Sequence, residues 1–265
     1  MDSDLFSVDN LTITFGGLKA VDKVGFKIKR SSIFSIIGPN GAGKTTIFNC
    51  ISGLYKPDRG KIIFKGEEIT GLRPHQIARK RIARTFQNIE LFSRMTTMEN
   101  LMLGRHIHIN TGVWSGSTFF RRGSKAAQQE IRHRERVEQI IDLLDLQSVR
   151  DQFVGGLPYG TQKLIELGRA LALEPELLLL DEPSAGMNSE DRQDLIFWIK
   201  DIQDELRVTI LLIEHNMKVV MDISDRILAI NFGRPIGEGI PEEVQRNPEV
   251  LKAYLGEEGP IDAVS

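Results

Sequence analysis

Residues 38–45 read Gly38-Pro39-Asn40-Gly41-Ala42-Gly43-Lys44-Thr45, and they connect a short apolar run, 33–37, to a stretch compatible with a helix, 44–54. This is the complete phosphate-loop pattern in the strand–loop–helix context that it requires. Glycines let backbone N–H groups close around phosphates at the positive end of a helix, where Lys44 adds a charge and the Thr45 hydroxyl can bind Mg²⁺. A tight turn that needs glycine for steric reasons alone is the weaker alternative. We therefore expect a nucleotide site formed by Gly38, Pro39, Asn40, Gly41, Ala42, Gly43, Lys44, Thr45 and Thr46.

A second motif is the apolar run 177–180, which ends in Asp181 and Glu182. In open α/β sheets the carboxyl end of such a strand faces the ligand crevice. Asp181 would hold hydrated Mg²⁺, and Glu182 would polarise an attacking water. A strand that ends in a solvated turn is the alternative, since Asp-Glu-Pro is good turn chemistry. Together with the phosphate loop, the two carboxylates form the second half of one site, and the absence of an Asn-Lys-x-Asp guanine-reading motif favours ATP over GTP.

The composition is that of a globular protein. Of 265 residues, 41% are hydrophobic and 26% charged, and 34 Lys and Arg against 36 Asp and Glu give a net charge of −2. These values exclude a disordered chain and give no sign of a general nucleic-acid surface. The single cysteine, Cys50, permits no internal disulfide, and the acidic N-terminus lacks the pattern of a signal peptide. These two features predict a cytosolic chain. The longest apolar runs are far shorter than the roughly 18 residues of a spanning helix, so we expect that the chain does not cross a bilayer by itself.

The first third of the chain is rich in strand signals. Residues 6–28 alternate in polarity around Gly16-Gly17, which predicts two strands joined by a turn, and residues 60–69 form a second glycine-punctuated β stretch. A charged segment follows Pro74. We interpret its charges as mostly a solvated face; they belong to His75, Arg79, Lys80, Arg81 and Arg84.

The remainder divides into a helical lobe and an α/β core. Residues 96–165 are read as the lobe, with an irregular aromatic-bearing insertion at 113–120 and helical spacing in Val137, Ile140, Ile141 and Leu144. From Leu177 on, predicted strands alternate with predicted helices, for example a helix at 190–206 followed by a strand at 208–213. This alternation is typical of βαβ units. The sequence therefore predicts a parallel α/β core.

The chain resembles the nucleotide-binding subunits of ABC transporters over nearly its whole length, with the family's markers in family order. Phe15 falls where an aromatic residue stacks on adenine, and Gln87 falls where a glutamine contacts Mg²⁺ and the membrane subunit. Residues 184–188 resemble the dimer-contact loop, and His215 resembles the switch histidine that contacts the γ-phosphate. An isolated Phe, Gln or His at such a place is more often core, surface or a strand cap, so the order and spacing of these markers carry the assignment.

The segment that distinguishes this family departs from its usual Leu-Ser-Gly-Gly-Gln form and reads Leu157-Pro158-Tyr159-Gly160-Thr161-Gln162. Pro158 stands where the family's serine donates a hydroxyl to the partner's γ-phosphate, and Tyr159 stands where a glycine is usual. Gly160 and a following helix remain, so anion binding can persist. This variant, the insertion before Arg121 and the tail 233–239 resemble the subgroup that serves branched-chain amino acid uptake.

The resemblance implies a phosphate-loop NTPase fold of the α/β class. The core would have a mixed, largely parallel sheet, an N-terminal antiparallel β subdomain and an inserted helical subdomain. One ABC ATPase domain would span residues 1–265, with the core and β subdomain in 1–95 and 166–265 and the helical signature subdomain in 96–165.

The resemblance also implies a composite machine that binds ATP and Mg²⁺. Two ATPase subunits, identical or different, would hold two ATP molecules head to tail. Hydrolysis would rely on Lys44, Glu182 and His215, with Thr45, Gln87 and Asp181 at the metal. A groove near Gln87 would dock transmembrane permease subunits, and a solute-binding protein would act indirectly. We expect a peripheral protein at the cytoplasmic face of the bacterial inner membrane, with no nucleic-acid partner.

Three alternatives stay open. A soluble ABC ATPase of nucleic-acid repair or translation usually carries coiled-coil insertions or two cassettes, although six Lys or Arg against two Glu in residues 121–136 would suit it. Another ABC system, such as lipopolysaccharide export, would share the ATPase. A regulator that does not hydrolyse ATP is disfavoured by Glu182 and His215. In the insertion, Trp114, Phe119 and Phe120 would contact either the permease or, as the plainer option, the helical lobe.

Overall fold

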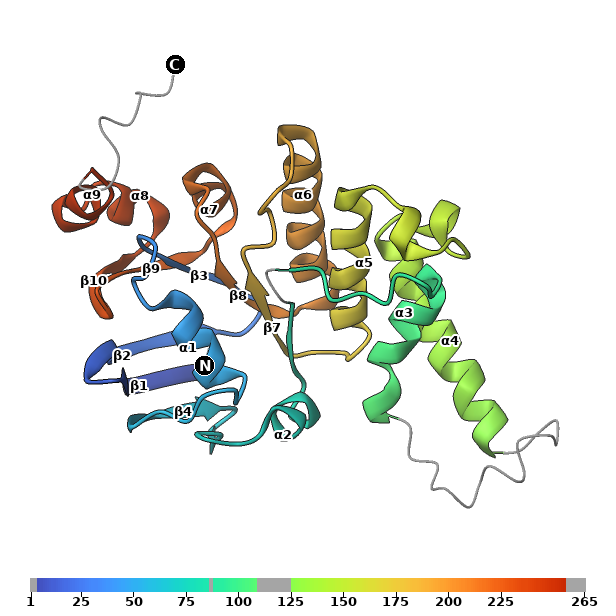
Figure 1. The fold of residues 1–265 in the computed structure, drawn as a ribbon, viewed down its shortest axis with the longest axis horizontal. Coiled ribbons are helices and arrows are strands. Elements are labelled where there is room, and N and C mark those ends of the chain that lie inside the picture. The colour runs from blue at the N-terminus through green and yellow to red at the C-terminus, as the bar shows by residue number, and fades with distance from the viewer. Residues whose placement is uncertain (1–3, 86–87, 109–124, 256–265) are drawn as a thin grey trace.

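An antiparallel sheet opens the fold. The computed structural model describes residues 4–85, 88–108 and 125–255, and in it two long strands form the expected hairpin around Gly16-Gly17 (Figure 1). A third strand pairs antiparallel with the first, which gives the order β2-β1-β4-β5. The bounds are β1 (Asp4–Phe15), β2 (Leu18–Lys29), β4 (Arg59–Phe64) and β5 (Glu67–Glu68).

The second sheet has the order β10-β9-β3-β8-β7-β6, in which all neighbouring pairs are parallel except β9 with β10. Every residue of β3, β7 and β8 is buried, as expected for parallel strands covered on both faces. The predicted fold, a largely parallel sheet with an antiparallel β subdomain, is confirmed. The bounds are β3 (Ile33–Ile37), β6 (Ile82–Arg84), β7 (Leu177–Asp181), β8 (Thr209–Ile213), β9 (Arg226–Asn231) and β10 (Arg234–Gly239).

Helices cover both faces of this sheet. One of them, α1 (Lys44–Ile51), directly follows the phosphate loop and buries Ile47 and Phe48 in the core between the two sheets. The others on this part of the molecule flank the C-terminal strands (Figure 1). They are α6 (Ser189–Leu206), α7 (Met217–Ile223), α8 (Pro241–Gln245) and α9 (Pro248–Leu255), whereas α2 (Pro74–Arg79) lies at the end of the molecule that carries β4 and directly precedes β6.

The charged segment after Pro74 is not a uniformly solvated face. α2 ends at Arg79, the chain turns through Arg81 in the left-handed region (φ 66°), and Ile82–Arg84 enters the sheet as β6. The Arg84 side chain is only 9% exposed. The expectation is therefore wrong for Arg84, because pairing of β6 beside β7 carries this residue into the interior.

A helical lobe packs at one side of the sheet, and its core is apolar. Leu101, Val137, Ile141 and Ile165 are fully buried there. Its elements are α3 (Thr97–Gly104), α4 (Lys125–Leu143) and α5 (Tyr159–Leu171), with short 3₁₀ turns at His106–His108, Gln147–Val149 and Val154–Gly156. The aromatic insertion at 113–120 lies outside the described residues.

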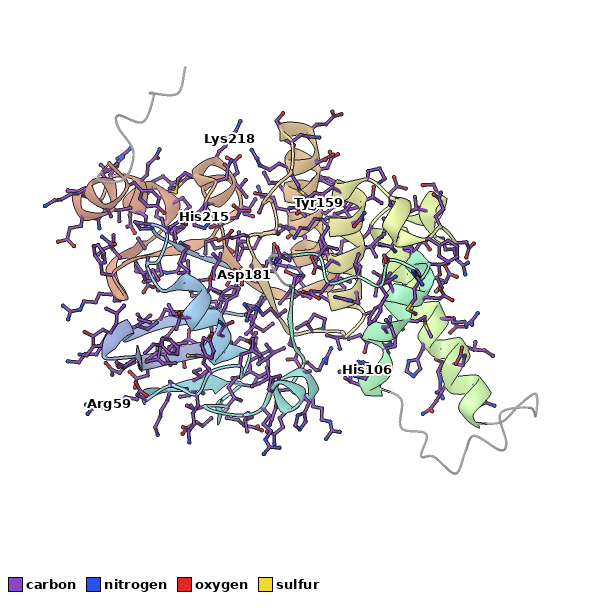
Figure 2. All side chains as sticks on the ribbon, viewed as in Figure 1. Arg59, His106, Tyr159, Asp181, His215 and Lys218 are labelled. Carbon is purple, nitrogen blue, oxygen red and sulfur yellow. The ribbon has the colours of Figure 1, made fainter. Side chains whose placement is uncertain are left out.

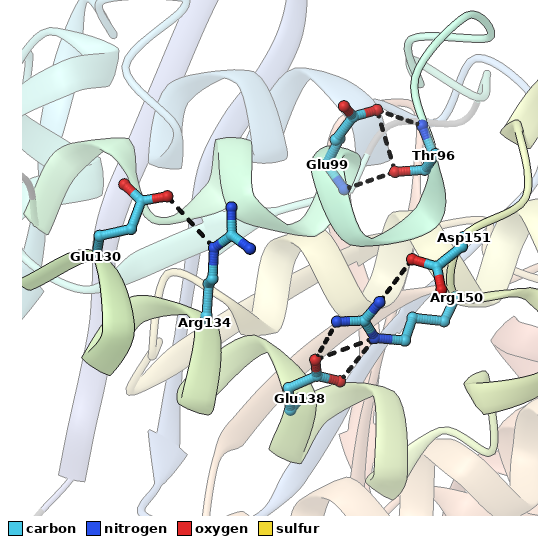
Figure 3. A network of polar contacts seen from close by, with 7 residues as sticks. All are labelled: Thr96, Glu99, Glu130, Arg134, Glu138, Arg150 and Asp151. Carbon is cyan, nitrogen blue, oxygen red and sulfur yellow. Dashed lines mark hydrogen bonds and ion pairs between the residues drawn. The ribbon is translucent and has the colours of Figure 1, made fainter. Parts of the chain in front are cut away.

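Polar contacts fix the ends of these helices (Figure 3). Thr96 Oγ1 accepts from the Glu99 backbone N–H at 3.2 Å while Glu99 Oε2 accepts from the Thr96 N–H at 2.8 Å, which is a capping box at the start of α3. Arg150 donates from Nε to both carboxylate oxygens of Glu138 at 3.0 and 3.1 Å, and so links the loop after α4 to the helix itself. The start of α3 and the loop after α4 are therefore both held by side-chain contacts.

Candidate active site

The phosphate loop runs between β3 and α1, as the sequence predicts. Gly43 is the N-cap of α1 and has φ 105°, so the loop turns into the helix through a conformation that favours glycine. Lys44, only 5% exposed, donates from Nζ to Gly38 O at 2.6 Å and to Pro39 O at 2.9 Å. The ammonium group thus lies across the inside of the loop, where a phosphate would meet it, and Thr45 is exposed on the first helical turn.

At two positions of the loop, neighbouring backbone atoms lie so close that only glycine fits. A Cβ atom on Gly38 would lie 2.1 Å from Ile230 O, and one on Gly43 would lie 2.4 Å from Ala20 O. These oxygens belong to β9 and β2, which cannot move without disturbing the sheets. The Gly233 N–H also donates to Ala42 O at 2.9 Å. The loop is therefore clamped on its protein side.

We expect Gly43→Ala to weaken ATP binding by about tenfold or more, because alanine opposes the left-handed backbone by roughly 1–2 kcal/mol and also collides with Ala20 O. The measurement is the Kd for a fluorescent ATP analogue. Gly156→Ala is the matched control, since a Cβ atom there meets nothing within 4 Å. Equal affinities of the two variants would contradict the role of this contact.

The carboxylates lie at the end of β7, beside the end of β8. Asp181 is the last residue of β7, and Glu182 follows with φ 49°, a left-handed conformation that is uncommon for a non-glycine residue. His215 lies just beyond β8, and its Nε2 is 2.5 Å from Glu182 Oε1. Figure 2 shows Asp181 and His215 in the same central region of the molecule. The structure thus brings the two predicted catalytic residues, Glu182 and His215, into direct contact.

Glu214 is a residue of this region that sequence reasoning missed. Its Oε1 accepts from the Ser184 N–H at 3.0 Å, and its Oε2 accepts from the N–H groups of His215 and Asn216 at 2.9 and 3.2 Å. Its side chain is buried and satisfied by the backbone on both sides. It therefore ties the loop after Glu182 to the loop that carries His215.

Arg84 is the second residue that sequence reasoning missed. Its Nη2 lies 2.7 Å from Asp181 Oδ2, and its Nη1 donates to Asn49 Oδ1 at 2.7 Å and to Ser52 Oγ at 2.9 Å. Burial raises the pKa of the Asp181 carboxyl above its ordinary value, and the Arg84 guanidinium counteracts that rise. One side chain therefore holds the carboxylate of β7 against the helix that follows the phosphate loop.

Phe15, the residue expected to stack on adenine, ends β1 and is 46% exposed. The Tyr55 ring lies against it in an edge arrangement, with centroids 5.3 Å apart. The face of an exposed aromatic ring is a flat apolar surface on which a base can stack. The expected metal and permease contact Gln87 lies outside the described residues.

The family-specific segment begins α5, with Pro158 as the N-cap. The Tyr159 hydroxyl donates to Ala185 O at 3.2 Å, and a Cβ atom on Gly186 would lie 3.3 Å from the same hydroxyl. Tyr159 therefore packs against the loop 184–188 of its own chain. The N-terminus of α5 lies beside α6, apart from α1, in the view of Figure 1.

Residues 21–185 match the model of the ABC transporter family. The chain belongs to this family. As a member it is an ATP-binding and ATP-hydrolysing subunit of an ABC transporter, which confirms the predicted activity. A second family model, described as branched-chain amino acid ATP-binding cassette transporter, matches residues 234–260.

This ABC ATPase has near relatives along its full length. It is 45% identical to the high-affinity branched-chain amino acid transport ATP-binding protein BraF of Pseudomonas aeruginosa, over 97% of this chain and 100% of that one. It is 42% identical, with the same coverage, to LivG of Escherichia coli. Among solved structures, an ATP-binding cassette of an ABC transporter in its ADP conformation superposes with a TM-score of 0.83 at 29% identity, covering 96% of this chain and 99% of that one.

No helix in the described part of the ABC ATPase has the length and apolar character needed to cross a membrane. Among the same residues, no three His, Cys, Asp or Glu side chains gather into a group that would hold a metal ion unaided. The assignments of individual side chains to nucleotide, metal and catalysis stay predictions.

Proposed function

We propose that this ABC ATPase powers the import of branched-chain amino acids such as leucine, isoleucine and valine. The observation that carries the proposal is the full-length similarity to transport subunits named for these substrates, together with the separate match at residues 234–260. The second match supports the subgroup, because it covers the C-terminal part, beyond the ATPase motifs.

The geometry supports a division of labour in hydrolysis. Lys44 and the loop N–H groups bind the phosphates, Glu182 orients and deprotonates the attacking water, and His215 holds the Glu182 carboxylate in place while it faces the γ-phosphate. Mg²⁺, when bound with ATP, neutralises charge on the phosphates. The exposed Thr45 hydroxyl and Asp181 fit it as oxygen ligands or through water, and Arg84 keeps Asp181 oriented.

The proposed assembly is a sandwich of two ATPase subunits on a membrane permease at the cytoplasmic face of the inner membrane. Separation of the α1 and α5 N-termini within one chain supports a site completed by residues 157–162 of a second subunit, identical or not. Residues 96–165 form the helical signature subdomain in this proposal. The permease docks near Gln87, a solute-binding protein acts through the permease, and no nucleic acid takes part.

We expect Tyr159→Phe to lower kcat about two- to tenfold with little change in KM for ATP, because only the bond to Ala185 O is lost and the loop after Glu182 becomes less fixed. Steady-state ATPase assays measure both constants. Tyr55→Phe is the control, since stacking uses its ring rather than its hydroxyl. A wild-type kcat in Tyr159→Phe would mean that this contact does not influence the loop.

The deciding experiment for the substrate uses the complete complex in proteoliposomes. Binding protein loaded with leucine should stimulate the ATPase and drive leucine uptake, whereas binding protein without ligand should not. Stimulation by a different solute class, with none by leucine, isoleucine or valine, would overturn the substrate proposal and leave the ATPase assignment intact.

A further inference from the structure

A basic cavity lies in the helical lobe, at the end remote from Tyr159. Its volume is about 330 Å³, and it is lined by Arg105, Gln129, Arg132, His133, Arg136 and Glu174. Arg105 is the first residue after α3, and its neighbour His106 is labelled in Figure 2 at the lower edge of the lobe. The 13-residue helix α5 runs between the two ends, so the cavity is about 20 Å from the start of the signature helix. It is therefore separate from the nucleotide site.

His133 contributes a buried donor to this cavity. His133 is only 9% exposed, and its Nδ1 accepts a hydrogen bond from Arg105 Nε at 3.3 Å. Arginine Nε can only donate, so Nδ1 of His133 carries no proton and Nε2 of the neutral ring must carry it. Burial, together with the charge of Arg105, lowers the pKa of His133, which favours this neutral form.

The Nε2–H of His133 makes no hydrogen bond within the part of the chain that the structure describes. Gln129 Oε1 is likewise buried without a partner there. Buried polar atoms without partners are rare in native proteins and each costs stability. Among the described residues, the cavity thus presents a free donor, His133 Nε2–H, and a free acceptor, Gln129 Oε1. A ligand that carries both an acceptor and a donor would satisfy the two atoms.

The charges around the cavity favour an anion. Its lining carries three guanidinium groups and one carboxylate. Arg105 Nη1 and Arg136 Nε both approach the same oxygen, Glu174 Oε1, at 3.3 and 3.2 Å. Arg132 has no ion-pair partner within the described ranges, while its neighbour Arg134 is paired with Glu130 at 3.3 Å (Figure 3). The lining therefore keeps an excess of positive charge, and Arg132 is the side chain most available to a ligand.

We propose that this cavity binds a phosphate group that keeps one P–O–H, as free hydrogen phosphate or as a singly protonated phosphomonoester. Its oxygens would accept from His133 Nε2–H and from the Arg132 guanidinium, and its P–O–H would donate to Gln129 Oε1. Sulfate supplies the acceptors without the hydroxyl, so it should bind less tightly. Arg105, 5% exposed and held by the Ala172 carbonyl at 2.8 Å, would form the fixed wall of the site.

Histidine ring NMR on the full chain tests the proposal at the atom concerned. In ¹⁵N-histidine protein, His133, assigned with His133→Gln, should show the neutral form protonated at Nε2. Inorganic phosphate should shift its ring signals saturably, and sulfate should do so at least several-fold more weakly. Phosphate bound in the phosphate loop does not confuse this readout, because the loop lies near His215 rather than His133.

Variants on one helix provide the matched comparison. Arg132→Gln should weaken phosphate binding about tenfold or more, since a charged hydrogen bond is lost. Arg134→Gln, two residues away with its guanidinium turned to Glu130, should leave the affinity unchanged. Both variants should keep the wild-type melting temperature and ATPase activity. A loss of phosphate binding in Arg132→Gln would then be due to the changed cavity and not to unfolding.

Sedimentation with vesicles containing phosphatidic acid, a lipid phosphomonoester, separates the two sources of phosphate. A saturable His133 shift with inorganic phosphate that Arg132→Gln weakens supports a soluble ligand. Vesicle binding that Arg132→Gln abolishes and Arg134→Gln retains, without a shift from free phosphate, supports the lipid. The proposal is overturned when neither is seen, or when Arg132→Gln responds like the wild type.

Discussion

Glu182→Gln is expected to bind ATP normally and to hydrolyse it about 10²–10⁴-fold more slowly. The amide keeps the size of the side chain and can still contact His215 Nε2, now 2.5 Å from the carboxylate, but it cannot take a proton from water. Because ATP stays intact, the proposed sandwich of two subunits should accumulate. Single-turnover hydrolysis and size-exclusion chromatography with ATP measure the two effects.

Glu205→Gln serves as the control for this variant, because Glu205 is exposed near the C-terminal end of α6. It should hydrolyse ATP at the wild-type rate and elute as the wild type does. A Glu182→Gln protein with normal turnover would remove Glu182 from the catalytic role. Slow turnover without a dimer would separate the chemistry from the proposed assembly.

Arg84→Met is expected to lower the free energy of unfolding by about 3–5 kcal/mol, because it leaves Asp181 as an uncompensated buried charge. Asn49 Oδ1 and Ser52 Oγ lose their donor at the same time. The deficit should shrink at acid pH: burial raises the pKa of Asp181, so protonation of the folded state removes the unpaired charge. Urea unfolding at two pH values measures both.

Two further variants show whether the ion pair itself is responsible. Arg226→Met removes an exposed arginine whose Nη2 is 3.2 Å from Glu238, and it should cost no more than about 1 kcal/mol. Combining Arg84→Met with Asp181→Asn should recover part of the loss, since no buried charge remains. If Arg84→Met and Arg226→Met lowered the free energy of unfolding equally, the Arg84–Asp181 ion pair would contribute no more to stability than an exposed ion pair does.

The cassette family and most of the core were predictable from the sequence because their signals are local. The phosphate loop occupies eight consecutive residues, and its strand and helix adjoin it. Asp181 and Glu182 end an apolar run that is recognisable by itself. The hairpin at Gly16-Gly17 follows from alternation and turn chemistry within a short window. Each of these patterns is complete before the chain folds.

The solvated interpretation of the charged segment failed at Arg84 for a physical reason. A run of arginine and lysine near a short helix is typical of a surface, and nothing in that run marks one member as different. The difference arises because β6 pairs with β7, which aligns Arg84 with Leu179 and brings its guanidinium to Asp181, 97 positions further along the chain. The strand order decides this.

By itself, the sequence determined which residues can bind phosphate and activate water, because backbone conformation and side-chain chemistry over a few adjacent positions suffice for that. Only the tertiary structure decided which distant groups hold them: Arg84 on Asp181, Glu214 between two loops, and Tyr159 on Ala185. The same is true of the basic cavity, whose lining comes from α4, the end of α3 and the segment after α5. Such contacts depend on how elements pack, and packing is fixed by the burial of the whole core rather than by any single stretch of chain.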